Sequence, residues 1–111
     1  DIVAGAPNAN RGTATQGEVL VFSSATCAIL RRMVDPLPNA SDSLGGAVAG
    51  IADVTGDGTP DIVAGSEADD TLSGNAGAVL LFSGANGALV RRLVDSTGGA
   101  SDGSVAVGRW R

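Results

Sequence analysis

The apolar residues of this chain fall in short runs that are separated by glycine, serine, threonine and aspartate. Each run is too short for a helix, and most contain β-branched or aromatic side chains, which favours buried strands. In the second half of the chain Asn86-Gly87 lies between two runs and predicts a type I′ hairpin turn, because this pair tolerates positive φ angles. The predicted strands lie at residues 1–5, 19–22, 28–35, 46–52, 61–65, 79–82, 88–95 and 104–108.

These runs repeat with a period of 60 residues. The sequence DIVAG at 1–5 returns at 61–65, and residues 17–35 align with residues 77–95. In this register 19 of the first 43 residues are identical to their counterparts, so we expect the two copies to share one fold. Each complete unit then holds four antiparallel strands in about 60 residues, which is the size of a β-propeller blade.

The repeat divides the chain into three parts of an all-β fold built from antiparallel four-stranded β-propeller blades. Residues 1–43 are predicted to hold strands two to four of one blade, and residues 44–95 a complete blade with a loop at 53–61. Residues 96–111 would hold the first strand of a third blade and an irregular tail. About two blades cannot close a ring of the usual four to eight. We therefore expect a partial propeller, a piece of a longer protein, or self-association in which 104–108 completes a neighbour's blade.

Two arginine pairs, Arg31-Arg32 and Arg91-Arg92, occupy the same place on the last strand of each unit. Neighbouring residues on a strand point to opposite faces, so neither pair forms a single patch. We interpret the pairs as charge on an exposed outer edge, which discourages edge-to-edge aggregation. Binding of an acidic partner is the alternative.

The segment 53–61, D-V-T-G-D-G-T-P-D, separates two predicted strands and carries the most distinctive chemistry of the chain. Asp53, Asp57 and Asp61 are candidate carboxylate ligands. Thr55 would act through its hydroxyl or a water, and Thr59 through its carbonyl. Ca²⁺ takes about six to eight oxygens at roughly 2.3–2.6 Å, and this spacing on a glycine-rich backbone can supply them. The alternative is a solvated turn rich in Asp and Gly.

Helix-linked calcium loops are excluded by the residues that follow. An EF-hand or dockerin-type loop needs an acidic residue at its twelfth position and a helix after it, whereas Ala64 stands there and Pro60 opposes a helical start. We expect a structural ion, not a catalytic one, that ties two strands together.

Composition excludes several classes of partner and of catalytic chemistry. The net charge of −5 argues against a nucleic-acid partner or an anionic membrane surface, and no apolar run is long enough to span a bilayer. Histidine is absent and Cys27 is the single cysteine, which excludes a Ser-His pair, an intrachain disulfide and a Cys₄ zinc site. The G-x-S-x-G pattern at 99–103 has no histidine to activate its serine. We expect no enzymatic activity.

The acidic loop at 53–61, the Ala-Gly strand after it (Ala4-Gly5-Ala6-Pro7 in the first copy) and Leu44-Gly45 before it resemble the FG-GAP repeat. That repeat builds the seven-bladed propeller of integrin α subunits and of many bacterial extracellular proteins. Leu44 stands where the family prefers Phe, and Thr55 where it prefers Asp or Asn. Ala64-Gly65-Ser66-Glu67 also departs from the Gly-Ala-Pro pattern.

This resemblance implies a calcium-stabilised, extracellular and non-catalytic module for adhesion or for recognition of a protein or glycan. The alternatives are an accessory propeller domain of a larger secreted enzyme and a purely structural, self-assembling fragment. The loops at 6–16 and 66–76 differ most between the copies. In a propeller they lie opposite the calcium loops, so ligand binding is expected there, because divergent loops on a repeated scaffold commonly carry binding.

Overall fold

The computed structural model of the chain describes residues 1–9, 16–36, 43–66 and 77–94. These residues form two antiparallel sheets and no helix, so none of them belongs to a helix long and apolar enough to cross a membrane. The fold of the described residues is therefore all-β, as predicted. The strands are β1 (Ile2–Ala6), β2 (Glu18–Phe22), β3 (Ile29–Met33), β4 (Leu44–Ile51), β5 (Asp61–Ser66), β6 (Ala78–Phe82) and β7 (Leu89–Leu93).

Each sheet is a simple meander, with the order β1-β2-β3 in the first and β4-β5-β6-β7 in the second. The two copies share one register: Ile2 pairs with Phe22 just as Ile62 pairs with Phe82. A register shift follows at the same place in each copy, between Val21 and Phe22 and between Leu81 and Phe82. The expectation that the two copies share a fold is confirmed for strands β1–β3 and β5–β7. Neither sheet closes on itself.

The predicted strands agree with the observed ones to within about two residues at most ends. The main difference is at β4, which begins at Leu44 and passes an irregularity before Ala47. Gly45 lies inside that irregularity with a φ of 97°, a backbone conformation that glycine adopts at little cost. The predicted strand at 104–108 and the whole segment 96–111 lie outside the described residues.

The predicted type I′ turn at Asn86-Gly87 is wrong. The amide of Ser83 donates to the Ala88 carbonyl at 2.9 Å and the amide of Gly87 donates to the Ser83 carbonyl at 2.8 Å, which encloses a four-residue loop. Within this loop only Gly87 has a positive φ, of 76°, whereas a type I′ turn needs two such residues. The Asn86 side chain instead accepts a hydrogen bond from the amide of Ala88 at 2.9 Å.

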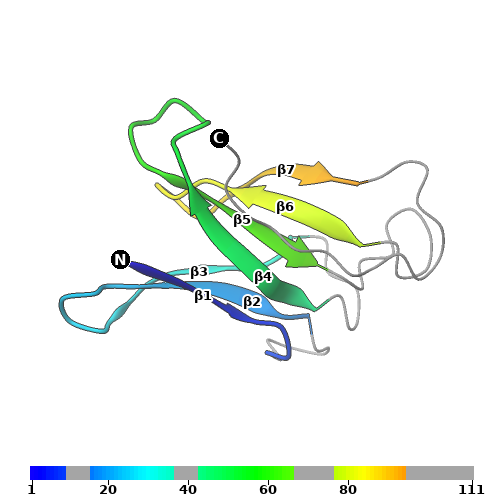
Figure 1. The fold of residues 1–111 in the computed structure, drawn as a ribbon, viewed down its shortest axis with the longest axis horizontal. Coiled ribbons are helices and arrows are strands. Elements are labelled where there is room, and N and C mark those ends of the chain that lie inside the picture. The colour runs from blue at the N-terminus through cyan, green and yellow to red at the C-terminus, as the bar shows by residue number, and fades with distance from the viewer. Residues whose placement is uncertain (10–15, 37–42, 67–76, 95–111) are drawn as a thin grey trace.

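The two sheets pack face to face around one hydrophobic core (Figure 1). Strand β6 alternates buried and partly buried positions, as expected for a strand with one face in a core. Strand β4 also lies against β1, and a Cβ atom on Gly5 would meet the Gly45 carbonyl oxygen at 1.8 Å, so the two backbones touch. The buried hydrophobic residues are Val19, Met33, Leu44, Ile62, Ala64, Ala78, Leu80 and Phe82.

The arginine pairs lie on the edge strands β3 and β7, and Arg31, Arg32 and Arg91 are exposed, as expected, whereas Arg92 is not. Arg92 forms an ion pair with Asp35 of the other sheet, and the two side chains are only 15% and 1% exposed. Arg31 donates to the carbonyl of Ala85, also across the two sheets. Arg32 is half-exposed and pairs with Glu18 of its own sheet at 2.9 Å. At least two of the arginines therefore join the sheets.

Candidate metal centre

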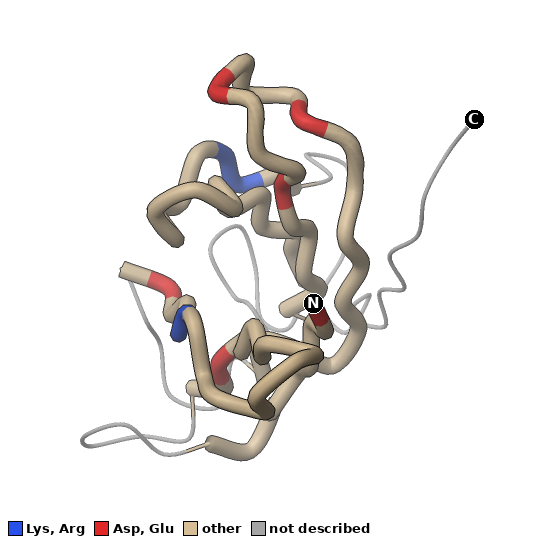
Figure 2. Tube along the Cα trace, turned by 90° about the vertical axis from the view of Figure 1, so that its left-hand side faces the viewer, with Lys and Arg blue, Asp and Glu red and all other residues tan. Residues whose placement is uncertain are grey.

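The acidic loop connects β4 to β5 and projects from one end of the second sheet (Figure 2). Gly56 and Gly58 have φ angles of 84° and 85°, and an added Cβ at either would meet no atom within 4 Å. Glycine is required there by backbone conformation and not by crowding. These two left-handed residues turn the backbone so that its amides face inward.

Asp53 organises the first half of the loop. Its Oδ1 atom accepts hydrogen bonds from the amides of Thr55 at 3.1 Å, Gly56 at 2.7 Å and Asp57 at 3.3 Å, and its Oδ2 accepts one from Gly58 at 2.7 Å. The amide of Gly58, more than any other group, lowers the pKa of the Asp53 carboxyl below its usual range, with further help from Gly56. The carboxylate is thus held ionised because the loop amides point at it.

Asp61 closes the loop from the start of β5 and has no exposed surface. Burial by itself raises the pKa of this carboxyl, but amide donors more than offset it, so the pKa lies below its usual range. Oδ2 accepts from Val54 at 2.8 Å and Thr55 at 3.0 Å, and Oδ1 accepts from Gly84 at 3.1 Å. Asp61 therefore remains charged although it is buried.

Asp57 lies at the tip of the loop and completes a group of three carboxylates. Its Oδ1 accepts from the amide of Thr59 at 3.0 Å, and its Oδ2 accepts from the Ser83 hydroxyl at 3.2 Å. One oxygen from each of Asp53, Asp57 and Asp61 lies within 4.8 Å of the other two. Ligands on opposite sides of a hard cation are about 5 Å apart, so these oxygens could hold one metal ion.

The two predicted threonine ligands occupy different positions. The Thr55 hydroxyl lies between two carboxylates, 3.2 Å from Asp53 Oδ1 and 3.3 Å from Asp61 Oδ1. Thr59 is half-buried, and its methyl group lies beside Gly84. Coordination through the Thr55 hydroxyl and the Thr59 carbonyl stays a prediction.

Sequence reasoning missed Ser83 and Gly84, which reach the acidic loop from the β6–β7 hairpin. A Cβ atom on Gly84 would lie 1.8 Å from the Pro60 carbonyl oxygen, so hairpin and loop touch at this point. A signal was present, because Phe-Ser-x-Ala occurs at 22–25 and at 82–85. The first copy makes the equivalent contact, in which the Ser24 amide donates to Asp1 Oδ1 at 3.4 Å.

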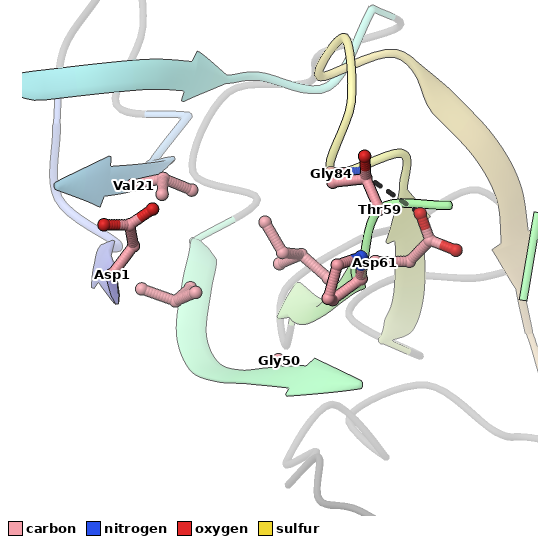
Figure 3. A pocket seen from close by; sticks show the side chains of 9 residues that line it. Asp1, Val21, Gly50, Thr59, Asp61 and Gly84 are labelled. Carbon is pink, nitrogen blue, oxygen red and sulfur yellow. Dashed lines mark hydrogen bonds between the residues drawn. The ribbon is translucent and has the colours of Figure 1, made fainter. Parts of the chain in front are cut away.

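A cavity of about 310 Å³ lies between the sheets beneath the loop (Figure 3). Val3 and Val21 of the first sheet and Ile62 of the second line it, together with Pro60, Gly84 of the β6–β7 hairpin, Asp1 and Asp61. The Asp61 carboxylate points away from Val21 and toward Gly84 in Figure 3. Its charge belongs to the acidic loop and not to this largely apolar space.

Comparison with protein-family models, curated proteins and solved structures gave no match to this chain. The resemblance to the FG-GAP repeat therefore rests on the residues of the chain itself.

Proposed function

We propose that the chain is a calcium-stabilised, FG-GAP-like β-propeller module that recognises a protein or glycan outside the cell and has no catalytic role. The observation that carries the proposal is the convergence of Asp53, Asp57 and Asp61, with oxygens within 4.8 Å of one another. The shared register of a three-stranded and a four-stranded meander, with the acidic loop between the first two strands of the second, supports the propeller architecture.

Calcium suits this donor set better than the other common metals. All candidate donors are oxygens, and the chain has no histidine, which disfavours zinc and copper. Asp53 and Asp57 are exposed, so waters can complete an irregular shell of six to eight ligands. Magnesium needs a nearly ideal octahedron at about 2.0–2.1 Å and usually keeps most of its waters.

The ion would act as a structural cross-link. The amides that point at Asp53 and Asp61 keep both carboxylates ionised but do not remove their negative charge. A divalent cation would neutralise that charge. Because Ser83 and Gly84 bond to Asp57 and Asp61, it also fixes the β6–β7 hairpin against the acidic loop.

Thermal unfolding with calcium and with chelator tests this role. Extracellular modules bind calcium with Kd on the order of 10⁻⁴–10⁻³ M. About 10 mM calcium should therefore stabilise the chain by about 1–3 kcal/mol, seen as a rise in Tm. Asp57→Asn should abolish the rise, because it removes one charge and keeps an oxygen for the Thr59 amide.

Asp1→Asn is the matched control. Asp1 is the repeat counterpart of Asp61, but it is exposed and belongs to no three-carboxylate group among the described residues. The Asp1→Asn chain should keep the full response to calcium. Equal Tm values in calcium and chelator for the unchanged chain would refute the structural role of the ion.

The recognition role rests on the divergent loops. Most of 6–16 and 66–76 lies outside the described residues, so the support comes from sequence divergence between the copies. Screening the calcium-loaded chain on glycan and matrix-protein arrays tests it. Replacement of 67–76 by a Gly-Ser linker of equal length should abolish any binding without changing the calcium response.

A further inference from the structure

The outer face of each sheet carries the repeat counterparts of the residues that the other sheet places in the interface between the two sheets. On the second sheet, paired positions alternate between two faces, and Val63, Leu81, Val79 and Leu93 share the face that points away from the first sheet. These side chains are partly or largely exposed, and Leu93 is 52% exposed. We call this surface the outer face of the second sheet.

A shift of 60 residues maps this outer face onto the inner face of the first sheet. Leu81 corresponds to Val21, and Leu93 corresponds to the fully buried Met33. Both Val21 and Met33 belong to the interface between the sheets. The remaining counterparts of Val63 and Val79 are Val3 and Val19, which pack in the same interface.

The outer face of the first sheet corresponds in turn to the inner face of the second sheet. Ile2 pairs with Phe22 and Ala4 pairs with Leu20 on the face that points away from the second sheet, and Ile2 is 56% exposed. These four residues are the counterparts of Ile62, Phe82, Ala64 and Leu80, all of which are buried in the core. The two outer faces therefore match the two inner faces at these apolar positions, whereas Glu18, on the outer face of the first sheet, is the counterpart of the buried Ala78.

The polar contacts across the sheets also have counterparts. Arg31 donates to the Ala85 carbonyl across the interface, and the shift gives Arg91 and Ala25. Arg92 pairs with Asp35 across the interface, and the shift gives Arg32 and Asp95, of which Asp95 lies outside the described residues. Arg32 lies on the outer face of the first sheet, opposite Leu20 in the register, and pairs there with Glu18, so a second chain would have to compete with Glu18 for it.

We propose that a second copy of this chain docks on the outer face of the second sheet through the outer face of its own first sheet. The contact reproduces the side-chain packing between the faces of β1–β3 and β5–β7 inside one chain, without the part that β4 adds there through Leu44 and its contact with β1. It joins two different surfaces, so it is heterologous and propagates head to tail into a ring or an open array. Its apolar part is formed by residues of β1–β3 and β5–β7, and it does not depend on strand exchange through 104–108 or on calcium.

Two variants, each with a charge on one of the two faces, test which faces meet in this contact. Leu81→Lys places a charge on the outer face of the second sheet, and Leu20→Lys places one on the outer face of the first. Sedimentation equilibrium over about 1–500 µM should show association of the unchanged chain by mass action. Each variant alone should stay a monomer of 10.8 kDa. An equimolar mixture should give a 1:1 species of twice that mass, because each variant keeps the face that the other has lost.

The mixture also serves as the folding control, since misfolded variants could not form a defined pair. Val54→Lys charges a side chain that is 59% exposed on the acidic loop and should leave self-association unchanged. Deletion of residues 104–111 should also leave it unchanged. An unchanged chain that stays monomeric at every concentration would overturn the proposal. So would a single variant that dimerises alone, because that requires contact between like faces.

Discussion

At the scale of single residues, the backbone of both hairpins requires a left-handed conformation at one position. Gly87 adopts it with φ 76°, and the counterpart in the first copy is Cys27 with φ 62°. The two loops share their backbone hydrogen bonds, so they have one geometry with two different residues. A side chain in this conformation costs about 1–2 kcal/mol. The first hairpin is therefore the strained copy.

Cys27→Gly should stabilise the chain by about 0.5–1 kcal/mol, because relief of this strain exceeds the extra unfolded-state entropy of glycine, about 0.4–1 kcal/mol. Gly87→Ala should destabilise it by a similar amount, since the space around Gly87 admits a methyl group and only the φ angle opposes it. Urea unfolding under reducing conditions measures both changes. The same sign for both variants would contradict the account of the loop.

The carboxylates of the acidic loop predict how stability depends on pH. Asp53 and Asp61 have folded-state pKa values below their ordinary value of 3.8. Their contribution is fully present well above pH 3.8 and is lost as the pH falls through the lower folded-state pKa. In chelator, the free energy of unfolding should therefore fall steeply below about pH 4.

Asp61→Asn should flatten this dependence and Asp1→Asn should preserve it, because only Asp61 is buried among amide donors. Urea titrations between about pH 6 and pH 2 give the two slopes. Parallel curves for the unchanged chain and Asp61→Asn would show that this carboxyl has no lowered pKa.

At the scale of elements, sequence patterns were sufficient to place the strands but not the contacts between them. Short β-branched runs and the 60-residue repeat predicted the strands β1–β7 and brought Asp53, Asp57 and Asp61 into one loop. The prediction of a type I′ turn was wrong because Asn-Gly also fits a longer loop with one left-handed residue. The roles of Ser83 and Arg92 depend on partners more than 20 residues away, which no local pattern identifies.

Contact between the acidic loop and the β6–β7 hairpin makes Gly84 sensitive to substitution. Gly84→Ala would force its Cβ against the Pro60 carbonyl, and the separation of the two loops should cost about 1–3 kcal/mol. It should also weaken calcium binding, because the Gly84 amide bonds to Asp61. Gly50→Ala on β4 is the control, since an added Cβ there meets nothing within 4 Å. Equal unfolding midpoints for the two variants in denaturant would contradict the close contact.

At the scale of the whole molecule, the described residues form two copies of one meander, β1–β3 and β5–β7, stacked in the same orientation, with β4 added to the second. The core, the Arg92–Asp35 pair and the Arg31 contact to Ala85 hold the second copy on the first. Because the two copies stack in the same orientation, each sheet has one face packed against the other sheet and one face that is not. This arrangement supports both proposals, a propeller built from such units and docking of a second chain by the same contact.

Amide NMR tests at the site itself whether one calcium ion binds among Asp53, Asp57 and Asp61. During a calcium titration of the ¹⁵N-labelled chain, the signals of Gly56, Gly58 and Gly84 should shift together, because their amides bond to these carboxylates. One Kd, on the order of 10⁻⁴–10⁻³ M, should fit all three.

The signal of Gly5, which lies in β1 of the other sheet, should stay in place in the same titration. Asp57→Asn should remove the three shifts. Loop amides that do not respond to calcium, or that respond equally in Asp57→Asn, would contradict the claim.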